Sequence, residues 1–190
     1  GSPSALGVLK QSGTLARLFG KSIVKGGNSF SGVLASEILR KKGFRTATRL
    51  DLEKILRDKN LKFPWNYVDF GVALITDGDS YQPNDLLAKY LTEQLRCRGI
   101  SLGAGKLISF NAFSLERNPN SAYGLVFNLN DEATQEDILD LSAFNWNYQR
   151  NDGMSQAYLN SCFDRNWNSV MRGLAYSHGN GRVVYVKPTE

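Results

Sequence analysis

Apolar residues recur at helical spacing in two segments of the first third of the chain. Residues 33–39 have this spacing and are followed by Gly43, a residue type that favours helix C-termini, which predicts one helix. A second helix is predicted to begin at Thr48, because Asp51 stands three residues later in a loose capping-box pattern. The apolar face of this second helix would comprise Leu52, Ile55 and Leu56.

The clearest helical pattern lies near the middle of the chain. It is predicted to open at Pro83 or Asn84 and to stop at Gly99, since proline favours the first turn of a helix and glycine its end. Its apolar face would comprise Leu86, Leu87, Tyr90, Leu91 and Leu95.

Apolar runs without helical spacing predict strands at residues 68–75, 107–115, 122–129 and 181–186. The second and third are separated by Asn118-Pro119-Asn120, which is a turn signal. The acidic residues 131–140 predict one further short helix. Together these elements predict an α+β fold.

Residues 142–182 have no sustained helical or strand period and are rich in Asn, Ser, Gly, Asp and aromatic residues. A loop region of this length inside a compact domain is usually functional or disordered. The many aromatic residues argue against disorder. We therefore expect an ordered, irregular surface, followed by the terminal strand.

Length and composition predict one domain. The chain has 190 residues, of which 42% are apolar and 22% charged, as in ordinary globular proteins. No apolar run approaches the roughly 20 residues that a membrane helix needs. We expect residues 1–31 to comprise an expression-tag remnant (Gly1 to Ser4) and a loosely structured lead-in, and residues 32–190 to form the domain.

Charge is unevenly distributed along the chain. Residues 1–62 hold 13 Lys and Arg against 4 Asp and Glu, whereas the net charge of the whole chain is only +5. Such a basic segment is most often a solvated helical face, but it is also typical of contact with nucleic acid, an acidic partner or a membrane surface.

The familiar catalytic and metal-binding patterns are incomplete. Gly20-Lys21-Ser22 and Gly105-Lys106 both lack the leading glycine of a phosphate-binding loop. A calcium loop starting at Asp77 would have Gln82 and Ala88 where a glycine and a carboxylate are needed. The single histidine, His178, has no orienting carboxylate beside it in the sequence, so neither catalytic residues nor a metal site are predicted. The two cysteines, Cys97 and Cys162, could form one bridge or remain free thiols.

Residues 158–180 have an unusual composition. Lys, Glu and Gln are absent, while Tyr, Asn, Ser, Gly, Asp, Arg and His dominate, as they do in antibody-like binding loops. Apolar residues recur at Leu159, Trp167 and Leu174. This pattern indicates either a binding surface between fixed apolar positions or a long exposed loop.

The run from Gly153 to Leu159, followed by Trp167, Leu174 and the ending Gly-Arg-Val-Val-Tyr-Val at residues 181–186, resembles the variable region of diversity-generating retroelement variable proteins. In that family a reverse transcriptase miscopies adenines of a template repeat, and Asn codons are the usual targets. The products exclude Lys, Glu, Gln and Trp, and apart from Met171 the residues between the apolar positions here fit the restricted set.

The resemblance implies a C-type lectin-like fold with a variable ligand-binding region at about residues 153–182. Ligand-binding positions would be Tyr158, Asn160, Ser161, Phe163, Asp164, Arg165, Asn166, Asn168, Ser169, Arg172, Tyr176, His178 and Asn180. Structural anchors would be Trp146, Leu159, Trp167, Leu174, Gly181 and Arg182. Aromatic residues and arginine dominate binding hot spots, so the largest energetic contributions are expected from Tyr158, Phe163, Arg172 and Tyr176.

The resemblance implies that the protein binds a ligand and is not an enzyme, and that it needs no cofactor and no metal. Its partner would be a protein or glycan on another cell or particle, and the protein would be displayed on a virion or cell surface of viral or prokaryotic origin. Two alternatives remain. One is an enzyme related to formylglycine-generating proteins. The other is a nucleic-acid-binding accessory protein that uses the basic residues Arg40, Lys41, Lys42, Arg45 and Arg49.

Overall fold

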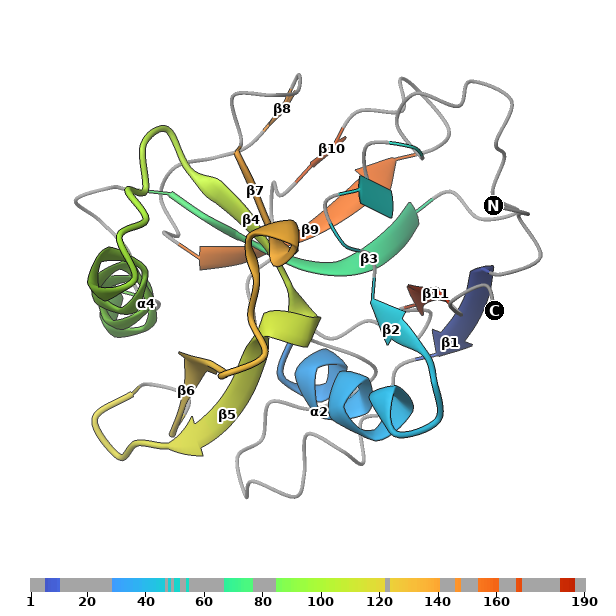
Figure 1. The fold of residues 1–190 in the computed structure, drawn as a ribbon, viewed down its shortest axis with the longest axis horizontal. Helices are drawn as coiled ribbons and strands as arrows, with labels where there is room; N and C mark the ends of the chain where they lie inside the picture. The colour runs from blue at the N-terminus through green and yellow to red at the C-terminus, as the bar shows by residue number, and fades with distance from the viewer. Residues whose placement is uncertain are drawn as a thin grey trace.

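The structure of the chain is a computed structural model. It describes residues 6–10, 29–46, 48, 50–51, 54, 67–76, 85–121, 124–140, 146–147, 154–160, 167–168 and 182–186. Within these residues the chain is α+β, with two helices and two sheets (Figure 1).

The larger sheet is mixed and brings together strands from both ends of the chain. Its main order is β1-β11-β3-β9-β10-β8, and β2, β4 and β7 join it to the side. These strands are β1 (Leu6–Lys10), β2 (Arg45–Thr46), β3 (Tyr67–Ile75), β4 (Lys106–Ser109), β7 (Ile138–Asp140), β8 (Trp146–Asn147), β9 (Met154–Asn160), β10 (Trp167–Asn168) and β11 (Arg182–Val186). The smaller sheet is the hairpin of β5 (Phe113–Arg117) and β6 (Leu125–Leu129).

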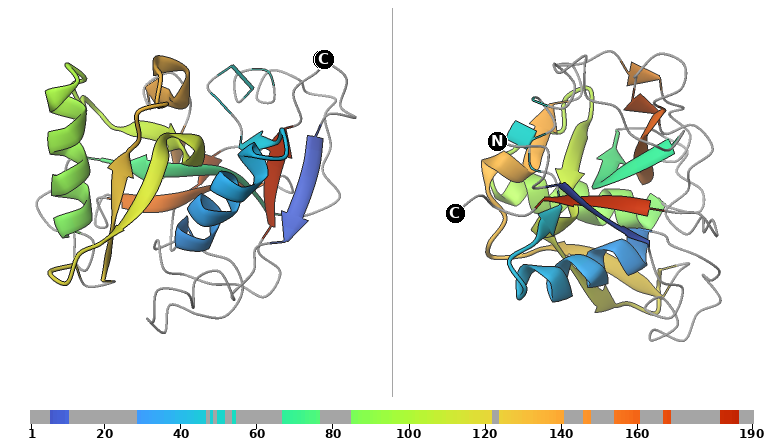
Figure 2. Two further views of the ribbon diagram at one scale, coloured as in Figure 1. Left: turned by 60° about the horizontal axis from the view of Figure 1, so that its bottom comes forward. Right: turned by 90° about the vertical axis from the view of Figure 1, so that its right-hand side faces the viewer.

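The helices flank the smaller sheet from two sides. Helix α2 (Ser29–Arg40) contacts β5, and helix α4 (Asp85–Cys97) contacts β6 (Figure 2). Each helix is followed by the predicted glycine, Gly43 after α2 and Gly99 after α4, and these glycines have φ values of +81° and +76°. After each glycine the next residue donates its N–H five residues back, from Phe44 to Leu39 and from Ile100 to Leu95, which closes the helix end.

One apolar core joins both helices to both sheets. In this core Phe127 of β6 is stacked on Phe30 of α2 at a ring-centroid distance of 5.0 Å and tilted against Phe113 of β5 at 5.2 Å. From α4 the core takes Leu87, Leu91 and Leu95. Tyr90, predicted to lie on that apolar face, is 38% exposed, because its position is rotated away from the stripe at every fourth residue.

The side chain of Gln94 on α4 closes the outer edge of β6. Its Nε2 donates to the Phe127 carbonyl at 3.1 Å, and its Oε1 accepts from the Leu129 N–H at 2.8 Å. Arg98 adds hydrogen bonds to the carbonyls of Leu129 and Asn130, both at 3.0 Å. A helix side chain thus takes the place of a neighbouring strand.

The predicted strands at residues 68–75 and 181–186 and the turn at residues 118–120 are confirmed. The run at residues 107–115 is not one strand: β4 ends at Ser109, a 3₁₀ turn follows at Phe110–Ala112, and β5 belongs to the other sheet. The apolar pattern continues through the break, so the pattern alone could not reveal it. Ser109 causes the break locally, since its Oγ accepts from the Asn111 N–H at 3.3 Å.

Three further expectations are corrected. Residues 131–140 form a 3₁₀ turn (Gln135–Asp137) and strand β7 rather than a helix, because β7 pairs with β4. Leu6–Lys10, expected in a loosely structured lead-in, is a strand paired with β11, and α2 begins before the predicted boundary at residue 32. Residues 142–182 are not irregular throughout, because β8, β9 and β10 lie there. Strands β1, β7 and β9 pair with β11, β4 and β3, which are distant in sequence, and local periodicity cannot detect such pairing.

A buried amide fixes the junction between the two sheets. Asn111, 8% exposed, accepts from the Thr46 N–H at 3.1 Å and donates from Nδ2 to the Thr46 carbonyl at 2.8 Å. The Thr46 and Ser109 hydroxyls, 2.9 Å apart, form another hydrogen bond at the same place. Strand β2 is thereby attached to the 3₁₀ turn between β4 and β5.

Replacing Asn111 with alanine is expected to lower the free energy of unfolding by about 2–4 kcal/mol, because both backbone groups of Thr46 lose their buried partner. Urea unfolding followed by tryptophan fluorescence measures this loss. Asn120→Ala, in the exposed turn, is the matched control and is expected to change stability by less than about 0.5 kcal/mol. Equal losses in the two variants would contradict this role for the Asn111 amide.

Candidate functional site

The structure describes only part of the predicted ligand-binding segment. Among the predicted ligand-binding positions, Tyr158 and Asn160 lie on β9 and Asn168 lies on β10. The others lie outside the described residues: Ser161, Phe163, Asp164, Arg165, Asn166, Ser169, Arg172, Tyr176, His178 and Asn180. Of the predicted anchors, Leu174 and Gly181 also lie outside, and Arg182 begins β11 opposite Lys10.

Three predicted anchors occupy one row across the sheet. Trp167 on β10 is in register with Leu159 on β9 and with Trp146 on β8. Leu159 is in turn paired with Val68 on β3. Residues that were chosen from a sequence resemblance, and are separated by up to 21 positions, therefore lie side by side on neighbouring strands.

The adjacent row contains two of the predicted ligand-binding positions. Tyr158 is in register with Asn168 on β10 and with Asp69 on β3, and Asn168 is in register with Asn147 on β8. Successive residues of a strand belong to opposite faces of a sheet, so this row and the anchor row belong to opposite faces. Asp69 and Asn147 were not among the predicted positions, because their place depends on strand register rather than on local composition.

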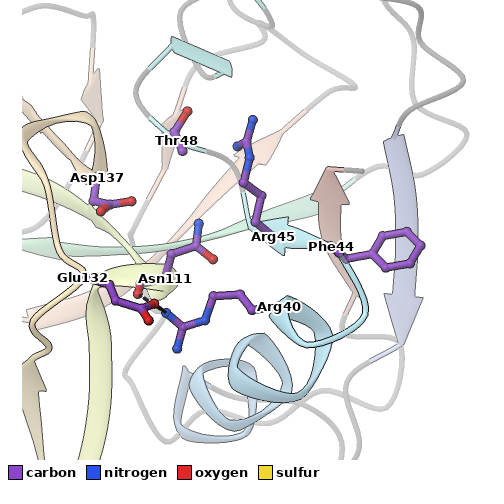
Figure 3. Close-up of a pocket in the computed structure, with 8 residues that line it drawn as sticks. Arg40, Phe44, Arg45, Thr48, Asn111, Glu132 and Asp137 are labelled. Atoms are coloured by element: carbon purple, nitrogen blue, oxygen red, sulfur yellow. Dashed lines mark hydrogen bonds and ion pairs between the residues drawn. The ribbon is translucent and has the colours of Figure 1, made fainter. Parts of the chain in front are cut away.

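A separate pocket of about 290 Å³ lies where the end of α2 meets β2 and the segment around residues 132–137 (Figure 3). Two arginines and two carboxylates are among its lining residues, which are Arg40, Gly43, Phe44, Arg45, Thr48, Asn111, Glu132 and Asp137. The phenyl ring of Phe44 points away from the other labelled side chains. No sequence motif indicated this pocket, since its residues come from segments that are far apart in the chain.

Arg40 connects two walls of the pocket. Its Nη1 donates to the Asn111 carbonyl at 3.1 Å and to Glu132 Oε2 at 2.9 Å. The Glu132 side chain is 79% exposed, so this ion pair faces water and contributes little to stability.

Arg45 and Thr48 form a second, more enclosed wall with Asp51. The guanidinium of Arg45 forms an ion pair with the Asp51 carboxylate, and the same carboxylate accepts from the Thr48 N–H at 2.9 Å, half of the predicted capping box. Burial opposes ionisation of Asp51, but the hydrogen bonds from Arg45 and Thr48 outweigh it and hold the pKa of this carboxyl below its usual value of 3.8. Leu50, Asp51 and Lys54 have helical backbone, whereas Leu52, Ile55 and Leu56 lie outside the described residues.

Asp137 is the buried acid of the pocket and is 8% exposed. Burial raises its pKa, although its Oδ2 accepts from the Thr134 N–H at 2.9 Å and from the Thr134 hydroxyl at 3.4 Å. Arg40 acts on this carboxyl only through a weaker long-range attraction.

The basic residues considered for nucleic-acid binding do not form a uniform cationic surface in the described part of the chain. Arg40 and Arg45 are held by Glu132 and Asp51, as described above, whereas Lys41 and Lys42 are exposed. Arg49 lies outside the described residues.

Other chemistry has little support in the described residues. They contain no group of three or more His, Cys, Asp or Glu placed to hold a metal ion. Cys97 is an exposed free thiol, and Cys162 lies outside the described part of the chain. Among the helices that are described, none has both the length and the apolar character needed to traverse a bilayer.

Comparisons of the chain with protein-family models, with curated proteins and with solved structures gave no match.

Replacing Asp51 with asparagine is expected to lower the free energy of unfolding by about 1 kcal/mol at pH 7. The loss is this small because the Arg45 side chain is 32% exposed, so that water weakens its attraction to the Asp51 carboxylate. Since the folded state lowers the Asp51 pKa, its contribution is fully present above the usual value of 3.8 and is lost as the pH falls through the folded pKa. Chemical unfolding of both proteins between pH 7 and pH 3 should show the difference shrinking with acidification. In the control Glu93→Gln, which removes an exposed ion pair with Arg96, stability should change little. A difference that grew with acidification would contradict the assignment.

Proposed function

We propose that this chain is a ligand-binding display protein of C-type lectin-like fold, whose C-terminal surface is diversified by adenine-directed mutagenesis from a retroelement. Its targets would be proteins or glycans on another cell or particle. The proposal treats the chain as a binding protein without catalytic residues, cofactor or required metal.

The observation that carries the proposal is the alternation of the two rows on β9, β10 and β8. Trp146, Leu159 and Trp167 are in register with one another, and the next row contains Tyr158 and Asn168. A diversified surface requires this separation, because varied residues must lie apart from the residues that stabilise the fold. The restricted residue set of the segment from 158 to 180 supports the same interpretation.

The element order supports the fold component of the proposal. Helices and sheet strands precede the variable segment, and the terminal strand β11 returns to pair with both β1 and β3. The segment from 158 to 180 thus begins on β9 and ends just before β11, and both strands pair with β3 in the larger sheet. This arrangement gives a varied segment two fixed ends.

The nucleic-acid alternative is not favoured by the described geometry, because carboxylates hold Arg40 and Arg45. It would require binding that weakens steeply with salt and survives deletion of residues 158–180. Measuring DNA and RNA binding of the full chain against salt concentration tests it directly.

The row assignment predicts a sharp contrast in mutational tolerance. Substituting Tyr158, Asn160 and Asn168 together with serine is expected to change the free energy of unfolding by less than about 1 kcal/mol. Trp146→Ala, Leu159→Ala and Trp167→Ala, measured singly, are each expected to cost about 2–5 kcal/mol, because they remove large apolar side chains at positions proposed to anchor the fold. Urea unfolding measures both sets, and equal tolerance would contradict the division into rows.

The retroelement component has its own test, which is sequencing of the surrounding DNA and of sibling genes. We expect a nearby near-copy of the segment encoding residues 158–180, a reverse-transcriptase gene, and differences confined to adenines of that copy. Siblings that vary evenly along the chain, with no near-copy, would refute diversification.

A further inference from the structure

The pocket at the end of α2 presents a cation whose donors are only partly used. Of the nitrogen atoms of Arg40, only Nη1 has hydrogen-bond partners among the described residues, namely the Asn111 carbonyl and Glu132. Nη2 belongs to the same planar fork of donors, and the pair of Nη1 and Nη2 matches the two oxygens of a carboxylate. The Arg40 side chain is 26% exposed, so a small molecule can approach it.

The same pocket presents an anion with an unused oxygen. Thr134 donates to Oδ2 of Asp137, and within the described residues Oδ1 has no hydrogen-bond partner. Figure 3 shows the Asp137 carboxylate directed toward the space that it shares with Asn111 and Arg40. Oδ1 is not among the buried atoms without a partner, so it is accessible from the open space, and an arriving cation can pair with it.

The remaining walls are fixed before any ligand arrives. The Asn111 amide is held by both backbone groups of Thr46, and Arg45 is held by Asp51. Gly43 adds no side chain, and a Cβ built on it would meet no atom within 4 Å, so the space beside it is open. Preorganised polar groups of this kind lower the cost of ordering the site on binding.

From these groups we infer that the pocket is a binding site for a small zwitterion of the size of a free amino acid. Its carboxylate takes the place of Glu132 on the Nη1 and Nη2 edge of Arg40, and its ammonium binds Asp137 Oδ1. The volume of about 290 Å³ lies at the lower limit of small-molecule pockets, which fits a ligand of this size. Glu132 competes with the ligand carboxylate for Arg40, but its exposed side chain is readily displaced into water.

This site is separate from the rows on β8, β9 and β10, and the inference does not rest on the proposed function. Isothermal titration calorimetry of the full chain tests it with glycine, L-alanine, L-serine, L-glutamate, L-lysine and L-phenylalanine at millimolar concentration. We expect saturable binding of at least one of them. Its N-acetyl derivative, which lacks the ammonium, and its amide, which lacks the carboxylate, should each bind at least about tenfold more weakly.

Variants of the pocket residues test whether Arg40 and Asp137 bind the ligand. Arg40→Gln and Asp137→Asn should each weaken binding about tenfold or more. Lys42→Gln removes an exposed charge that is outside the pocket lining and should have no effect. Glu132→Ala removes the competing carboxylate and should tighten binding about threefold. This variant keeps the test decisive if Arg40→Gln or Asp137→Asn fails to fold, because Glu132 is largely exposed.

Any of four results would overturn the inference. They are the absence of binding by all six amino acids, equal binding of the blocked derivatives, an equal effect of Lys42→Gln and Arg40→Gln, and unchanged or weaker binding in Glu132→Ala.

Discussion

The amide of Asn111 is the interaction on which the junction of this fold depends. It pairs with the N–H and the carbonyl of Thr46 as a neighbouring strand would, but from a 3₁₀ turn between two sheets. The carbonyl of the same residue accepts from Arg40 and from Asn130, at 3.1 and 2.8 Å. A single buried residue thus connects β2, the end of α2 and the segment after β6. Both the change from one sheet to the other and the shape of the pocket depend on it.

Much of the fold could be predicted from the sequence because the signals were local. The glycines after α2 and α4 and the turn at residues 118–120 act within a few residues of themselves, and each lies where the pattern places it. Strand pairing is different. Nothing within Leu6–Lys10 reveals that β11 completes it. The mixed polar and apolar sequence of Met154–Asn160 conceals a seven-residue strand that pairs with β3. The break at Ser109 was hidden for the opposite reason, because apolar residues continue on both sides of it.

The two candidate sites differ in the same way. Trp146, Leu159 and Trp167 were identified from a resemblance in sequence, and strand register then places them in one row. Asp69 and Asn147 enter the neighbouring row only through pairing, so composition could not have found them. The pocket gave no sequence signal, since Arg40, Asn111 and Asp137 have no spacing that marks them as a group. Local sequence patterns do not show which distant segments come together in the fold.

The contact between α4 and the edge of β6 has a consequence for association between molecules. An open strand edge is a template on which another chain can add a strand, and this is a common start of aggregation. Gln94 already satisfies the Phe127 carbonyl and the Leu129 N–H on that edge. At these positions the hairpin therefore has no free backbone groups with which an incoming strand could form hydrogen bonds. A chain with the proposed diversified surface would gain from such protection, because each new set of surface residues would meet one fewer open strand edge on neighbouring molecules.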